Sequence, residues 1–344
     1  MGKKEHRMHM FSMQPTIDAY CDESDYELAS ATEKESFIED KPSMSYWQDA
    51  WRRFKANKVA MASLFTIIAL VIFAFIGPML SPYDYAEQIR GSENLAPSLA
   101  HPFGTDTLGR DNLVRTMFGT RISMIIGAVA SLIVLFIGSI YGAISGYFGG
   151  VIDNIMMRFV ELIYSIPDIL IVLLLATVLK QPLQMAFNNA TGDFMRRFAT
   201  LGPSLIAIFI AFGLLYWVGT ARIIRGQVLM LKEQEFVTAA RALGASNSKI
   251  IKKHLLPNCI GQLIVTTCLQ IPSAIFLESF LSFLGFGVSA PMTSLGSMAA
   301  DALKGVYTYT YRLIIPAVIL SVLILALNLV GDGLRDAFDP KLKK

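Results

Sequence analysis

The stretch from Glu235 to Pro257 reads EFVTAARALGASNSKIIKKHLLP and lies between two apolar runs of membrane length. In its first half, Phe236, Val237, Ala240 and Leu243 recur at helical spacing. This spacing predicts a short helix with one apolar face.

A second short helix is predicted after Gly244, because glycine readily ends a helix. Either Ser246 or Ser248 can cap the second helix, and Pro257 is expected to end it where the next apolar run begins. The apolar residues of this second helix are Ile250, Ile251 and Leu255. The sequence therefore predicts a helical hairpin that joins two membrane spans.

The composition around this hairpin is that of an integral membrane protein. Of the 344 residues, 53% are hydrophobic and only 17% are charged, and the mean hydropathy is +0.50. These values exclude a soluble domain. Since about 20 apolar residues cross a hydrocarbon core, we predict six spans, at Val59 to Leu80, Ser123 to Ile144, Met157 to Leu179, Leu201 to Thr220, Cys259 to Phe280 and Leu313 to Val330.

Basic residues predict the orientation, because Lys and Arg close to spans stay on the cytoplasmic side. They gather in three segments, residues 52–58, 221–258 and 335–344. Arg110, Arg115 and Arg121 are a local exception. We therefore expect both termini in the cytoplasm, with the loop 221–258 on the same side.

The chain before the first span divides into two parts. Residues 1–44 are polar, rich in acids and without the apolar run of a signal peptide, so we expect a disordered cytoplasmic tail. Residues 45–58 hold Trp47, Trp51 and Phe54 at helical spacing among basic residues, which predicts an amphipathic helix in the membrane interface. Residues 59–344 would form the six-helix domain.

Glycines recur every four residues in the second span, at Gly138, Gly142, Gly146 and Gly150. A helix face without side chains allows another helix to approach its backbone closely. These glycines predict a tight helix contact.

Ionisable residues inside a membrane are costly and are candidates for function. Arg158 and Glu161 are spaced to pair with each other. Asp168 follows Pro167 within the third span, so it would either face a translocation pathway or cap the helix after the proline. Glu278 is expected near the outer interface, where it would be hydrated and could also contact the pathway.

The hairpin resembles the cytoplasmic coupling loop of ATP-binding-cassette importer permeases. Ala239, Ala240, Gly244, Leu256 and Pro257 match that family's motif. Thr238 stands where the family has Glu, and His254 stands where it has Ile. The Thr238 difference puts a specific ion pair with an ATPase in doubt.

Four other segments are similar to the C-type subunits of oligopeptide, dipeptide and nickel importers. They are residues 101–111 (HPFGTDTLGRD), 278–287 (ESFLSFLGFG), 294–298 (SLGSM) and 331–340 (GDGLRDAFDP). The resemblance covers nearly everything from Tyr46 onward. It implies a type I ABC importer permease fold in the bacterial cell membrane, and a chain that forms half of a peptide pathway.

By this resemblance, the expected partners are a homologous second permease subunit, two ABC ATPases, an extracytoplasmic substrate-binding lipoprotein, the peptide and membrane lipid, with no nucleic acid. Phe236, Ala240 and Leu243 would fill an apolar groove on an ATPase. The full expected coupling set is Glu235, Phe236, Thr238, Ala239, Ala240, Arg241, Leu243, Gly244, Leu256 and Pro257.

No catalytic role is expected for this chain. It has no phosphate-binding loop, zinc-protease motif or nucleophile elbow, so ATP and Mg²⁺ would be bound by the partner ATPases. A metal site at His101, Asp106 and Asp111 is not expected, because their spacing matches no known ligand motif.

Two alternatives remain open. The expected cargo is oligopeptides, because the chain is long and has an extended tail before Ser45, and dipeptides or nickel are the alternatives within the same family. An ion-coupled secondary transporter is the rival of another class; it would show two halves with matching broken helices, and the sequence has no obvious internal repeat of that kind.

Overall fold

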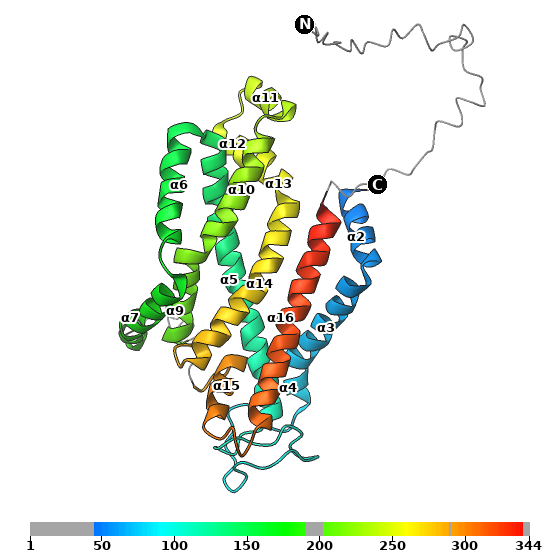
Figure 1. The fold of residues 1–344 in the computed structure, drawn as a ribbon, viewed down its shortest axis with the longest axis vertical. Helices are drawn as coiled ribbons and strands as arrows, with labels where there is room; N and C mark the ends of the chain where they lie inside the picture. Colours follow the sequence, from blue (N-terminus) through cyan, green and yellow to red (C-terminus); the bar gives the residue numbers. More distant parts are fainter. Residues whose placement is uncertain (1–44, 190–201, 289, 340–344) are drawn as a thin grey trace, which may run out of the picture. The chain divides into compact units, whose positions relative to one another are not determined.

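The computed structural model describes residues 45–189, 202–288 and 290–339. The predicted tail, residues 1–44, lies outside the described residues. Within them the all-α prediction is confirmed, since the regular elements are helices accompanied by one isolated β-bridge between Thr105 and Asp111 (Figure 1).

The elements run in chain order through three groups. The first is α2 (Tyr46–Ala56), α3 (Lys58–Phe75), α4 (Gly77–Leu80), α5 (Asn112–Phe148), α6 (Gly150–Tyr164) and α7 (Asp168–Asn188). The second is α9 (Pro203–Ala211), η3 (Phe212–Tyr216), α10 (Trp217–Leu231), α11 (Glu235–Ala242), α12 (Asn247–Ile250), η4 (Ile251–Leu255) and α13 (Leu256–Asn258). The third is α14 (Ile260–Phe283), α15 (Leu295–Leu303) and α16 (Tyr311–Phe338).

Six helices in the described part are long and apolar enough to cross a membrane, which confirms the predicted number. They are α3, α5, α7, the continuous helix Pro203–Leu231 formed by α9, η3 and α10, then α14 and α16. The fourth span extends well beyond its predicted end at Thr220.

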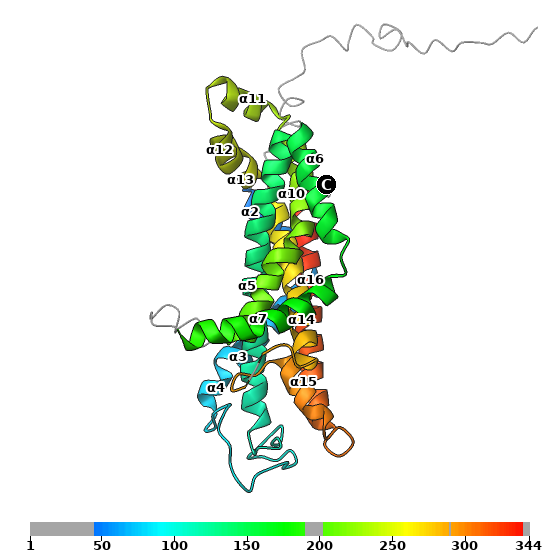
Figure 2. The same ribbon diagram turned by 90° about the vertical axis from the view of Figure 1, so that its left-hand side faces the viewer.

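The third span is not the continuous helix predicted from Met157 to Leu179. Helix α6 ends at Tyr164, and α7 begins at Asp168. Proline lacks a backbone N–H and disfavours helical geometry at the residue before it, which accounts for a break at Ile166 and Pro167. Figure 2 shows the result: α6 runs along the bundle, whereas α7 turns across it.

The two ends of the bundle differ in what they carry. Helices α11, α12 and α13 project at one end, together with α2 and the C-terminal end of α16 (Figures 1 and 2). We call this the hairpin end; α4, α15 and the connection 81–111 lie at the opposite end. Residues 52–58, 221–258 and 335–339, the described part of the three basic segments, thus share one end as predicted, and their cytoplasmic placement remains a prediction.

The glycine stripe of α5 packs against α10. A Cβ built on Gly138 or Gly142 would meet the backbone carbonyls of Trp217 or Ala221, respectively, and one on Gly146 would meet that of Arg225. Gly150 is not part of this contact, contrary to the prediction. Helix α5 ends at Phe148, so Gly150 is already the first residue of α6, and a Cβ built on it would meet nothing within 4 Å.

The aromatic residues of α2 divide between two environments. Phe54 is buried against Ala60 and Ala337, which joins α2 to α3 and α16. Trp47 and Trp51 are about half exposed. Trp51 stacks on Phe54 with ring centres 5.7 Å apart, and Trp47 contacts Phe338 of α16 at 5.8 Å. Phe54 thus anchors the helix to the bundle, and the placement of α2 in the membrane interface stays a prediction.

Candidate coupling hairpin and translocation cavities

The segment Glu235 to Asn258, hereafter the hairpin, has the helix–turn–helix form predicted for it. Gly244 has φ +78°, a backbone conformation that glycine adopts without steric cost. The N–H of Gly244 donates to the carbonyl of Arg241, and that of Ala245 donates to the carbonyl of Ala240, both at 3.0 Å. These two bonds give hydrogen-bond partners to backbone carbonyls at the C-terminal end of α11, and they set the direction of the turn.

The structure shows which serine caps the second helix of the hairpin, and it corrects the predicted role of Pro257. Ser246 occupies the cap position, although its side chain makes no capping hydrogen bond. Pro257 does not end the second helix. It lies in the first turn of α13, where its missing N–H is not needed, and the helical path continues through Cys259 into α14.

The apolar residues of α11 and Leu243, its C-cap, do not share one face. Val237 is fully buried and Ala240 is 8% exposed, whereas Phe236 is 39% and Leu243 is 88% exposed. Phe236 and Leu243 are thus free to contact a partner, but Ala240 is not. The predicted docking set of Phe236, Ala240 and Leu243 is therefore wrong at Ala240.

The inward side of the hairpin is packed on the ends of α5 and α10. Val237, Ile250 and Leu255 form one buried cluster with Tyr147 and Ile224. Tyr147 of α5 also donates its hydroxyl hydrogen to Asn247 Oδ1 at 2.8 Å, and the Arg241 guanidinium lies 5.9 Å from the Tyr147 ring centre. A displaced hairpin would therefore carry α5 and α10 with it.

An ion pair that the sequence did not reveal lies near the same end. Arg225 of α10 makes two bonds to Asp153 of α6, which also accepts a hydrogen bond from Ser145 of α5. The two charged residues are 72 positions apart. In the sequence, this ion pair could be recognised only as two opposite charges near the ends of different spans. By contrast, the predicted pair of Arg158 and Glu161 is present at 3.0 Å.

Two adjoining cavities lie along the bundle. The larger, about 880 Å³, is lined by α10, α14, the end of α16 and Tyr46 of α2. The smaller, about 580 Å³, lies at the break between α6 and α7. Gly219 and Gln270 line both, so the two spaces meet at these residues.

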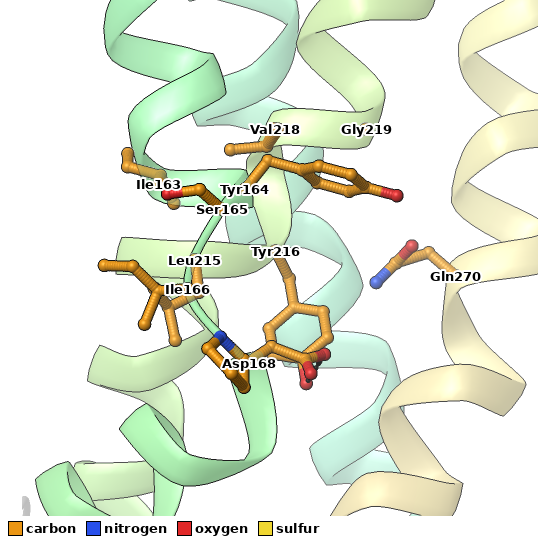
Figure 3. A pocket seen from close by; sticks show the side chains of 11 residues that line it. Ile163, Tyr164, Ser165, Ile166, Asp168, Leu215, Tyr216, Val218, Gly219 and Gln270 are labelled. Carbon is orange, nitrogen blue, oxygen red and sulfur yellow. Dashed lines mark hydrogen bonds between the residues drawn. The ribbon is translucent and has the colours of Figure 1, made fainter.

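Asp168 lines the smaller cavity (Figure 3). Tyr216, the last residue of the π-helix η3, donates its hydroxyl hydrogen to Asp168 Oδ2 at 2.9 Å. The N–H of Ile169 donates to Oδ1 at 2.9 Å, while Pro167 is the residue at the cap position. The structure therefore favours the cavity-facing alternative for Asp168.

Glu278 is fully buried, so the expectation that it is hydrated is wrong. Its carboxylate accepts hydrogen bonds from Ser282 at 2.6 Å, Ser123 at 3.2 Å and Ser279 at 3.3 Å. The chain after α14 folds back over this position, where Val288 N–H donates to Ser282. Glu278 lines neither cavity, and a pathway role for it has no support from this geometry.

At the opposite end, Asp106 is the centre of a polar cluster. It pairs with Arg110 at 2.6 Å and with Arg115, which also lies 3.3 Å from Asp301. Burial alone would raise the pKa of Asp106, but the charges of Arg115 and Arg110, with two backbone N–H bonds, hold it below its usual value. These pairs neutralise two of the basic residues that were an exception to the charge rule.

His101 and Asp111 form a separate pair at 2.8 Å. Asp106 is engaged elsewhere, so the three candidate residues of this loop do not converge. Residues 45–189, 202–288 and 290–339 contain no group of three His, Cys, Asp or Glu side chains that could hold a metal ion.

Six membrane-length helices and a hairpin packed on two of them define a multi-pass helical permease of the bacterial inner membrane. The chain belongs to the family of binding-protein-dependent transport system inner membrane components, whose model matches residues 135–344. Residues 45–97 match the N-terminal TM domain of oligopeptide transport permease C. The resemblance seen in the sequence is therefore confirmed.

Individual relatives agree with this family. The dipeptide transport system permease protein DppC of Bacillus subtilis is 47% identical over 305 residues, 88% of each chain. The oligopeptide transport system permease protein OppC of the same organism is 43% identical over 319 residues, 93% of this chain and 97% of the relative. The OppC protein of Escherichia coli K12 is 40% identical over 86% of this chain and 92% of its own.

Proposed function

We propose that this chain is one membrane subunit of an ATP-driven bacterial peptide importer. The relatives named above, which are oligopeptide and dipeptide permeases, support this substrate class. It would pair with a homologous second permease chain, engage two cytoplasmic ATPases and receive peptide from an extracytoplasmic lipoprotein. ATP and Mg²⁺ would be held by the ATPases, and this chain would carry no catalytic residue.

The observation that carries the proposal is the two-sided hairpin. Phe236 and Leu243 are exposed on it, whereas Val237 and Ile250 are fully buried against the bundle. Exposed apolar side chains on a packed, projecting element are typical of a docking surface. We therefore assign Phe236 and Leu243, with Glu235, Thr238, Ala239 and Arg241 around them, to ATPase contact.

The packing of the hairpin on α5 and α10 also connects its movement to the movement of these helices. When the ATPases close, they would push the hairpin, and Tyr147 and Asn247 would transmit the displacement to α5. Helix α10, which packs on the α5 glycines, would move with it and change the width of the cavity that it shares with α14. Packed helices switch between discrete arrangements, which suits an alternating pathway.

Oligopeptides are the proposed cargo, with dipeptides or nickel as alternatives inside the family. The test is reconstitution of the chain in liposomes with its second permease, its ATPases and peptide-loaded binding protein. Peptide uptake should require hydrolysable ATP and persist when ionophores remove all ion gradients. Uptake that survives ATP depletion but stops without an ion gradient would instead establish a secondary transporter.

A further inference from the structure

Three glutamine side chains that line the larger cavity have no hydrogen-bond partner among the described residues. Gln262 and Gln270 of α14 and Gln227 of α10 line it and are half-buried. Their side-chain amides make no hydrogen bond to the part of the chain that the structure describes. Figure 3 shows Gln270 pointing from α14 toward Tyr164 and Tyr216 on the other side of the smaller cavity.

An unpaired amide at the depth of Gln270 calls for a polar ligand. Gln270 lies near the middle of α14, a helix of membrane length. A polar group without a hydrogen-bond partner is costly in an apolar environment. These side chains must therefore face water or a molecule that offers both donors and acceptors.

Three polar residues of α14 form a row whose spacing matches that of the main-chain groups of an extended polypeptide. Gln262, Thr266 and Gln270 follow at intervals of four residues and all line the larger cavity. At a rise of about 1.5 Å per residue, successive members are about 6 Å apart along the helix. An extended peptide presents main-chain groups on one edge every two residues, about 6.7 Å.

The row is also neutral. A glutamine amide offers two donors and one acceptor oxygen, and the hydroxyl of Thr266, which donates to the Gln262 carbonyl at 2.8 Å, keeps an acceptor site. Within α14 the only charged residue is Glu278, which is buried elsewhere. This row therefore offers no charge of its own to the cargo; the charged residues that line the same cavity, Arg335 and Asp339, lie at the end of α16 and just after it.

We propose that Gln262, Thr266 and Gln270, with Gln227 opposite, bind the main chain of an extended peptide as it passes through the larger cavity. The inference rests on the proposed peptide transport and specifies its substrate class: short extended peptides read through their backbone, whatever their side chains. The four residues are thus cargo-binding residues of the pathway that do not select among side chains.

The first test is the double variant Gln262→Leu with Gln270→Leu, which keeps volume and removes the amides. Uptake of trialanine, trilysine and triglutamate is measured in the reconstituted complex with saturating loaded binding protein. We expect all three rates to fall by a similar factor, about tenfold for two lost hydrogen bonds. The matched control is Gln184→Leu on α7, which lines neither cavity and should leave all three rates unchanged.

The second test is Gln270→Glu, which is nearly isosteric. If the peptide passes this side chain, the new charge should raise the ratio of trilysine to triglutamate uptake by about fivefold at low salt. This single variant keeps the wild-type side-chain volume, so it tests the same contact even where the double variant assembles poorly.

Three results would overturn the inference: uptake by the double variant that falls for only one peptide, uptake that does not change for any peptide, or loss of the second permease from the purified variant complex. The last would show that the amides bind the partner subunit. Failure of the proposed function looks different, because the unmodified complex would then show no ATP-dependent uptake of any of the three peptides.

Discussion

Arg225 and Asp153 hold three helices together at the hairpin end. The guanidinium of Arg225 lies 2.6 Å from Asp153 Oδ1 through Nε and 2.5 Å from Oδ2 through a terminal nitrogen. Asp153 is on α6 and Arg225 on α10, and Ser145 of α5 donates to the same carboxylate. The pair therefore joins the helix that carries the hairpin to the helix before the α6–α7 break.

Replacing Asp153 by Asn should loosen this junction. The Arg225 side chain is 32% exposed, so solvent screening limits the loss of stability to about 1–2 kcal/mol. We expect the complex to assemble and hydrolyse ATP while uptake falls about tenfold, because motion of α10 no longer reaches α6. The control is Glu161→Gln, which breaks the exposed pair with Arg158 and should change uptake less than twofold. Equal effects of the two variants would contradict this role.

Gly244→Trp should insert normally but abolish ATP hydrolysis coupled to transport. The position has φ +78°, and nothing lies within 4 Å of the point that a Cβ would occupy, so the strain is about 1–2 kcal/mol and the bulk obstructs docking rather than folding. Gly91→Trp is a matched control, because Gly91 has φ +86° and equally open surroundings at the opposite end. Normal uptake by Gly244→Trp would refute the assignment of the hairpin.

Leu243→Asp should reduce recovery of the ATPase with the purified permease. Leu243 is 88% exposed and supports no internal packing, so the variant should fold as well as the unmodified chain. Loss of one apolar contact from a docking surface weakens binding by about 2 kcal/mol or more. Leu99→Asp, at a fully exposed residue at the opposite end, should leave recovery unchanged. Equal recovery for both variants would argue against ATPase contact at Leu243.

Gly142→Ala should destabilise the bundle, because the added methyl group meets the backbone carbonyl of Ala221. Overpacking of this kind costs about 1–3 kcal/mol, and a thermal unfolding curve in detergent would show it as a lower midpoint. Gly226→Ala on α10 is the control. Its Cβ meets nothing, and alanine favours a helix over glycine by up to about 1 kcal/mol, so its midpoint should stay or rise.

Asp106 should make stability depend on pH at the end opposite the hairpin. Its folded pKa is lowered, so its stabilising effect is present above the ordinary carboxyl pKa and is lost as the pH falls through the folded value. Asp106→Asn should cost about 3 kcal/mol at pH 7. The difference in unfolding midpoint between variant and unmodified chain should shrink as the pH is lowered. Asp84→Asn, at an exposed residue, provides the control. A difference in unfolding midpoint between Asp106→Asn and the unmodified chain that stays constant with pH would exclude protonation of Asp106 as the cause.

Local features were predicted from the sequence better than long-range ones. The turn at Gly244 depends on a few adjacent residues, and span number depends on apolar length, so both could be anticipated. Helical spacing placed Phe236 and Val237 on one apolar patch but could not say which of them packs on the bundle, because that depends in part on Tyr147 of α5, 90 positions away.

The burial of Glu278 could not be predicted either, because it also depends on residues that are distant in the sequence. Its depth was judged from its position along one span, whereas its surroundings come from Ser123 on α5 and from the chain that returns after α14. Pro167 marked a break, but the direction that α7 takes after it depends on packing with other helices. The pair of Asp153 and Arg225 joins segments that no local pattern connects.

Helix α5 has 37 residues without a break, which at 1.5 Å each makes a rod of about 55 Å, nearly twice the hydrocarbon thickness of about 30 Å. One tip holds Arg115 in the Asp106 cluster, and the other holds Tyr147 against Asn247. A stiff lever of this length links the two surfaces of the protein directly. A loaded binding protein that docked at one tip would therefore displace the other tip directly, without a change in the cavities.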